Sequence, residues 1–205
     1  PDVTGYPVVQ SAFGSHTLDP DYCNLTAAYA DSVANVCSGT YTIYRNWTIT
    51  NACDPNNGDT TLLQVIEVAD TTGPVVDCPL QDHYCPILDE NIMLFHTDPF
   101  ECTGTVEAPW PVVSDVCSDN WTVITQIVAF DGVTVLHVID PADPRIIAGL
   151  AIGDYYFRYI VTDDCNNTTV KDCIFRVADL EEPVAICHDG LNVSLGGGCL
   201  ARLYT

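Results

Sequence analysis

The strongest constraint in this sequence is an internal repeat. The segment VADTTGPVVDC, which ends at Cys78, returns 109 residues later as VADLEEPVAIC, which ends at Cys187. Two further pairs of segments match in the same order: DPDYC to VANVCSG with DPFEC to VSDVCSD, and RNWTITNAC with RYIVTDDC. A repeat of this length is one domain-sized module rather than a short solenoid unit. We therefore expect three parts: module one at 1–73, module two at 74–182, and the first strands of a third module at 183–205.

Within each unit, apolar and polar residues follow a period of two rather than 3.6. Asp131-Gly132 stands between two such runs, which is a strong signal for a β-hairpin. No segment shows the helical period over as much as three turns. Alternating, β-branched or aromatic runs of this kind predict half-buried strands, here at 40–50, 61–69, 154–162 and 169–178. The sequence therefore predicts an all-β chain whose modules are β-sandwiches, with DTTGP and DLEEP as short linkers between them.

The chain contains 11 cysteines among 205 residues, which is far above the usage typical of a reducing compartment. No CxxC pair or zinc-like spacing accompanies them, so we expect disulfides and a secreted location. One pair of cysteines occupies equivalent positions in the two units, with 13 intervening residues in the first unit and 14 in the second. Two further pairs of cysteines would close short loops. The predicted bonds are Cys23–Cys37, Cys102–Cys117, Cys78–Cys85 and Cys165–Cys173.

Three cysteines have no unique partner in this scheme. Cys53 is left over, and it could instead bind Cys37, which would free Cys23. Cys187 and Cys199 either bind each other or bind residues of a third module beyond this stretch. The chain also begins without Met and ends within a strand-like segment, so we take it to be a stretch of a longer polypeptide.

The net charge is −22, from 28 acidic and 6 basic residues. Such a surface repels phosphate backbones and anionic lipids, and no apolar run approaches membrane-spanning length, so we expect neither nucleic-acid binding nor membrane insertion. The same charge attracts hard divalent cations, and calcium is the cofactor it would favour. The candidate ligands lie near predicted module ends: Asp70, Asp77, Asp115, Asp119, Asp163, Asp164, Asp179 and Glu181. The alternative is a solvated acidic surface that binds no metal.

Several landmarks together resemble one known family. The segments DCPL, ECTGTVEAPWPVVSDVCSDN, FRYIVTDDCNNTTVKDCIFRVAD and EEPVAIC are similar to the recurring elements of hyalin-repeat (HYR) modules. The first unit departs from the pattern, because no cysteine follows Cys53 as Cys173 follows Cys165. The resemblance implies Ig-like modules of the kind strung together in large secreted bacterial cell-surface proteins, and with them an adhesive or structural role.

The sequence offers no recognisable catalytic motif. HExxH, GxSxG and glycine-rich phosphate loops are all missing, and the five histidines fall on separate segments, so we expect no enzymatic activity. Six sequons, at Asn24, Asn46, Asn120, Asn166, Asn167 and Asn192, carry sugar only if the source has a glycosylating secretory pathway.

Two functions from different classes remain. The first is a non-enzymatic extracellular protein whose tandem modules form a cell-surface fibre or filament, with reach and surface contact as its task. The second is a carbohydrate-binding accessory module of a secreted enzyme, which would use exposed aromatic rings. Trp47, Trp110 and Trp121 are the candidates for that role, although we expect tryptophans of β-sandwiches to lie in the cores.

The last segment favours assembly over a free monomer. Residues 183–205 can form at most two strands, and an isolated hairpin is marginal in water. These strands therefore need either the rest of their own module or the sheet of a second copy. The second case gives a head-to-tail contact, which propagates into a filament when its rotation does not close.

Overall fold

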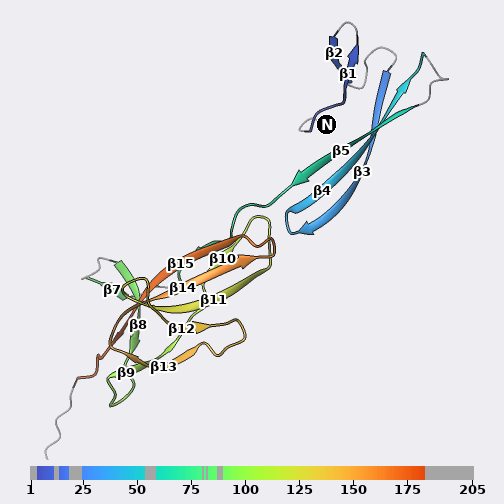
Figure 1. Cartoon of the computed structure of the whole chain (residues 1–205). Helices are drawn as coiled ribbons and strands as arrows, with labels where there is room; N and C mark the ends of the chain where they lie inside the picture. The colour runs from blue at the N-terminus through green and yellow to red at the C-terminus, as the bar shows by residue number, and fades with distance from the viewer. Residues whose placement is uncertain are drawn as a thin grey trace, which may run out of the picture.

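The computed structural model describes residues 4–11, 14–18, 25–53, 59–79, 81, 83–86 and 90–182. Every regular element among these residues is a strand, which confirms the predicted all-β class. Figure 1 shows the strands in two groups that lie end to end, β1 to β5 in one and β6 to β15 in the other. No helix long and apolar enough to cross a bilayer is found within the described parts of the chain.

The second group is built on a six-stranded mixed sheet with the order β12-β11-β14-β15-β8-β7. All of its pairs are antiparallel except β15 with β8, where Phe175 stands beside Met93 in a parallel register. The strands run over β7 (His83–Cys85), β8 (Glu90–His96), β11 (Trp121–Ala129), β12 (Val135–Ile139), β14 (Gly153–Asp163) and β15 (Thr168–Ala178).

Two small antiparallel sheets complete the second group, and one hydrophobic core joins them to the large sheet. The first small sheet pairs β13 (Ile146–Ala151) with β9 (Thr103–Glu107), and the second pairs β10 (Val112–Ser114) with β6 (Val75–Asp77). Val106 of β9 and Val76 of β6 share the core with Phe157 and Phe175 of the large sheet. The rings of the two phenylalanines stack with centroids 4.0 Å apart. The second group therefore has two packed layers.

The strands of the core follow the predicted period of two. On β14, Phe157, Tyr159 and Val161 are fully buried while the residues between them are partly exposed. The hairpin predicted at Asp131-Gly132 is also confirmed, since β11 and β12 pair on either side of it. Asp131 accepts hydrogen bonds from the backbone N–H groups of Val133 and Thr134, and Gly132 adopts a left-handed φ of 72°. Glycine is the residue that takes this conformation without strain.

The first group contains one three-stranded antiparallel sheet, β3-β4-β5, and one small hairpin, β1-β2. Its strands are β1 (Val8–Ser11), β2 (Gly14–Thr17), β3 (Leu25–Cys37), β4 (Thr40–Asn51) and β5 (Thr60–Val68). The predicted strands 40–50 and 61–69 are confirmed as β4 and β5, and 154–162 and 169–178 as β14 and β15. A second layer comparable to that of the other group is not seen among the described residues of this part.

The N-terminal segment covers part of one face of the three-stranded sheet. Trp47 is only 2% exposed, lies against Tyr6 and Tyr29, and donates a hydrogen bond to the side chain of Gln64. Gln64 in turn donates to the carbonyl oxygen of Thr4. Trp47 is therefore a core residue, as expected of tryptophans in such modules.

Candidate functional site

The most distinctive site in the described structure is the junction between the two groups of strands. Cys37, at the end of β3, is joined by a disulfide to Cys165, which follows β14; their Cα atoms are 5.4 Å apart and the residues are 128 positions apart in sequence. The β3–β4 turn of the first group is thus covalently bonded to the β14–β15 turn of the second. A short connection, residues 69–74, links the two groups along the chain at the same place.

Asp164 adds polar contacts to this covalent link. Its Oδ2 accepts hydrogen bonds from the Oγ of Ser38, at 2.6 Å, and from the backbone N–H of the same residue, at 3.1 Å. Its Oδ1 accepts a bond of 2.9 Å from Ser118. These bonds, that from the Ser38 hydroxyl above all, lower the pKa of Asp164, since they favour the charged form. One carboxylate therefore holds both sides of the junction.

Asp163 shapes the turn on which Cys165 lies. It is 5% exposed, and its Oδ1 accepts the backbone N–H groups of Cys165 and Asn167 at 2.8 Å each. Asn166 between them has a left-handed φ of 68°, which asparagine tolerates better than most residues. The side chain of Asn167 also donates to the carbonyl oxygen of Asp70 in the connection.

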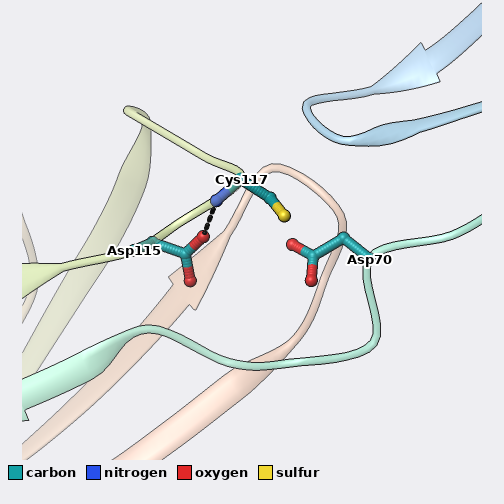
Figure 2. A group of neighbouring side chains, drawn as sticks. All are labelled: Asp70, Asp115 and Cys117. Carbon is teal, nitrogen blue, oxygen red and sulfur yellow. Dashed lines mark hydrogen bonds between the residues drawn. The ribbon is translucent and has the colours of Figure 1, made fainter.

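Asp70, Asp115 and Cys117 form a cluster at the same junction. One oxygen of each carboxylate and the sulfur of Cys117 lie within 4.8 Å of one another (Figure 2). Asp115 accepts the backbone N–H of Cys117 at 2.8 Å, and Asp70 accepts both the N–H and the hydroxyl of Thr72 through its Oδ1. The Oδ2 of Asp70 is buried and meets no hydrogen-bond donor among the residues that the structure describes.

The surroundings of Cys117 disfavour its thiolate. Cys117 is exposed as a whole, but its pKa is raised, first by the partial desolvation of the thiol and then by the negative charges of Asp70, Asp115 and Asp163. A thiol in such an environment stays protonated and reacts slowly at neutral pH.

The eight predicted metal ligands are distributed unevenly. The structure brings Asp70 and Asp115 together, whereas Asp163 and Asp164 already accept protein hydrogen bonds. Asp77, Asp119, Asp179 and Glu181 join no group of three or more potential ligands in the described part of the chain. The cluster that does form includes a sulfur, which suits zinc better than calcium, because calcium prefers oxygen ligands throughout.

The predicted disulfide pairs are wrong wherever the structure describes both residues. Cys78 binds Cys173 rather than Cys85, with Cα atoms 5.6 Å apart, and Cys165 binds Cys37 rather than Cys173. Since Cys37 is used in this bond, Cys23–Cys37 is also wrong, although Cys23 itself lies outside the described residues. Unpaired cysteines in the described parts are Cys53, Cys85, Cys102 and Cys117, so Cys102–Cys117 is not formed.

The physical reason is that both observed bonds join separate strands rather than close short loops. Cys78 follows β6 in one layer of the second group, and Cys173 lies in β15 of the other layer. Strand packing brings these residues together, at a sequence separation of 95 residues.

Cys187 and Cys199 lie outside the described residues. Two disulfides in one chain indicate that it folds in an oxidising compartment.

Trp110 and Trp121 line a second candidate site, a shallow groove of about 470 Å³ on the second group of strands. Trp110 is 55% exposed, so the expectation that it lies in the core is wrong. The guanidinium of Arg145 lies 3.9 Å from the centre of its ring and donates to the carbonyl oxygens of Ala108 and Pro109. Trp121 packs against the core from the rim of the groove.

Ser38 and Arg145 contribute to the two sites but are not among the residues that the sequence predicts for them. Nothing in the sequence near Ser38 distinguishes it from the other serines, and only the meeting of the two turns brings its hydroxyl to Asp164. The one available signal for Arg145 is the rarity of basic residues, because the chain contains only six. No protein-family model matches the chain, and no curated protein shows significant similarity to it.

Proposed function

We propose that the chain is a non-enzymatic, extracellular structural or adhesive protein whose tandem Ig-like modules form part of a cell-surface fibre or filament. The observation that carries the proposal is the Cys37–Cys165 bond, which joins one group of strands to the next. An enzyme needs its domains positioned around a reactive site, whereas a fibre needs successive modules held in line. The HYR-like landmarks of the sequence support the same conclusion.

The junction supports a stiff connection rather than a flexible one. Pro74 is fully buried, and a Cβ on Gly73 would stand 2.7 Å from the hydroxyl of Thr169, so the connection runs tightly against the start of β15. Hydrogen bonds from Ser38 to Asp164 and from Asn167 to Asp70 cross the same boundary. Covalent, packed and polar contacts together limit bending between the two groups.

Strand β3 offers a surface for the head-to-tail assembly. It is 13 residues long and, like β5, is an edge strand of its sheet among the described elements. Its one charged residue, Asp31, is engaged by Arg45 on the neighbouring strand, so little charge guards the open edge. An edge of this kind is able to accept a strand from a second copy, and residues 183–205 provide strand-forming sequence for that purpose.

Light scattering and electron microscopy of the intact secreted protein test this proposal. We expect filaments or fibres in non-reducing buffer, with a repeat that matches the length of the chain. A variant with Pro substituted at Ala30, within the open β3 edge, should shorten or abolish them. Val133→Ser, at an exposed position in the β11–β12 loop that keeps the N–H accepted by Asp131, should not. Monodisperse single chains of the unmodified protein would contradict the proposal.

Mechanical extension of the single chain tests the role of the junction separately. While the Cys37–Cys165 bond is intact, the residues between them cannot be extended. Full reduction should therefore lengthen the stretched chain by roughly 420–460 Å, from 128 residue steps of about 3.3–3.6 Å. The double variant Cys78→Ser with Cys173→Ser is the matched control, because it keeps the junction bond and should show the same limit before reduction.

One observation favours a second function, binding of a neutral glycan in the Trp110–Trp121 groove. Two tryptophans line one open groove, and Arg145 holds the ring of Trp110 in place. The negative surface disfavours anionic sugars. A glycan array probed with the chain and with Trp110→Ala separates the functions: a pure spacer binds nothing, and a lectin-like module loses binding in the variant.

A further inference from the structure

We propose that the junction disulfide is exchangeable: the thiol of Cys117 can displace Cys37 from Cys165 and form a Cys117–Cys165 bond in place of the Cys37–Cys165 bond. The exchange would convert a covalent link between the two groups of strands into a link within the second group. It needs no second copy of the chain and no external oxidant.

The first support is that the sulfurs of Cys117 and Cys165 border the same short turn. The Sγ of Cys117 lies 3.1 Å from the position that a Cβ of Gly39 would occupy. The Sγ of Cys165 lies 3.1 Å from the carbonyl oxygen of Ser38 and 3.4 Å from the hydroxyl of Thr40. The turn at 38–40 therefore contacts the sulfur of Cys165 at Ser38 and Thr40 and the free thiol of Cys117 at Gly39.

The second support comes from the strands that carry the two cysteines. Cys117 precedes β11 and Cys165 follows β14, and these strands pair antiparallel, with Trp121 directly opposite Asp163. A hydrogen bond of 2.9 Å from Ser118 to Asp164 joins the residues that flank the two cysteines. The pairing of β11 with β14 thus holds Cys117 beside Cys165 independently of the first group.

The chemistry of the exchange is balanced. The thiolate of Cys117 attacks the Sγ of Cys165, a new S–S bond forms, and the bond between Cys165 and Cys37 breaks. Its electron pair leaves with the Sγ of Cys37, which then takes up from solvent the proton that Cys117 released. One disulfide and one thiol are present before and after, so nothing is oxidised or reduced overall.

Four acidic groups face this site. Asp70 comes from the connection, Asp115 from the loop of Cys117 itself, and Asp163 and Asp164 from the end of β14 and the turn after it. The attacking species in thiol–disulfide exchange is the thiolate, so the exchange should be slow at pH 6 and become faster as the pH rises.

Peptide mapping after rapid alkylation tests the proposal on the full chain without reductant. After incubation at pH 9, we expect peptides that join Cys117 to Cys165, together with alkylated Cys37, and few such peptides after incubation at pH 6. A Cys165 that remains bonded only to Cys37 throughout would overturn the proposal. Cys117→Ser should abolish the new peptides.

Removal of Cys37 tests the geometry without kinetics. In Cys37→Ser, whose circular dichroism should match that of the unmodified chain, Cys117 and Cys165 should form one intramolecular bond when oxidised glutathione is added as the two-electron oxidant, which is itself reduced to two glutathione thiols. Two persistent thiols in the folded variant would show that the two sulfurs cannot meet. The pH series on the unmodified chain stays decisive if this variant fails to fold.

Discussion

Arg45 and Asp31 stand directly opposite each other on β4 and β3 and form a bidentate pair, with N–O distances of 2.8 and 2.7 Å. The guanidinium also donates to the hydroxyl of Thr4 and lies 4.2 Å from the centre of the Tyr29 ring. One arginine thus connects the two strands with the N-terminal segment. The hydrogen bond from Arg45 lowers the pKa of Asp31, because it stabilises the carboxylate.

The first prediction concerns the pH dependence of this pair. A carboxylate whose pKa is lower in the folded state than in the unfolded state stabilises the fold above its unfolded pKa, near 3.9, and loses this effect as the pH falls through the folded value. Asp31→Asn should therefore lower the melting temperature of the first group at pH 7 and have a smaller effect at pH 3. Glu67→Gln, on the same sheet, is the control. Equal losses at both pH values would contradict the prediction.

The second prediction concerns the aromatic core of the second group. Phe175 is fully buried and contacts the rings of Phe157, Phe95 and Tyr155. Phe175→Ala should lower the free energy of unfolding by about 3–5 kcal/mol, since it removes packing and leaves a cavity. Val170→Ala on the same strand, where the side chain is 56% exposed, should cost less than about 1 kcal/mol. Urea unfolding measures both, and similar losses would argue against a core centred on Phe175.

The strands of the core could be predicted because their signal is local. Alternation along 154–162 and the Asp-Gly pair at 131–132 depend only on neighbouring residues, and both predictions hold. Strand β3 was not predicted, since LTAAYADSVANVC is rich in alanine and contains Asp and Asn, which rarely favour strands. Its extended shape comes from pairing with β4 along nearly its whole length.

The junction could be predicted only in part, because its contacts are between segments far apart in sequence. The spacing of cysteines within one repeat favours pairs that are close in sequence. The observed disulfides instead join cysteines that the packing of the strands brings together. The bond between Cys37 and Cys165 spans the two repeats, so a comparison of one repeat with the other could not indicate it. Asp70 and Asp115 were both chosen as candidate ligands, but their proximity follows from the path of the connection.

The third prediction concerns Arg145, whose guanidinium makes three hydrogen bonds and one cation–π contact. It donates to the carbonyl oxygens of Ala108 and Pro109 and to the hydroxyl of Thr125, and its guanidinium stacks on Trp110. Lysine cannot reproduce this fork, so Arg145→Lys should lower the free energy of unfolding by about 1–3 kcal/mol.

Arg158→Lys is the matched control for this prediction. Arg158 forms its ion pair with Asp172 at a more exposed position, where the same substitution should cost at most about 1 kcal/mol. Urea unfolding followed by tryptophan fluorescence measures both variants. A loss for Arg158→Lys as large as that for Arg145→Lys would show that the stacked geometry contributes nothing specific.

The last prediction concerns divalent cations at the junction. Asp70 and Asp115 direct carboxylate oxygens toward one another in a chain with a net charge of −22, so a bound cation would relieve their repulsion. Millimolar calcium should raise the melting temperature relative to EDTA, by the equivalent of about 2.7 kcal/mol at a concentration 100 times the dissociation constant. Zinc should act at lower concentration than calcium if the sulfur of Cys117 is a ligand. Asp70→Asn and Asp115→Asn should weaken the response, while Glu107→Gln, at an exposed position of β9, should leave it unchanged. An identical melt in EDTA, calcium and zinc would show that the cluster is a solvated acidic surface, the alternative that the sequence left open.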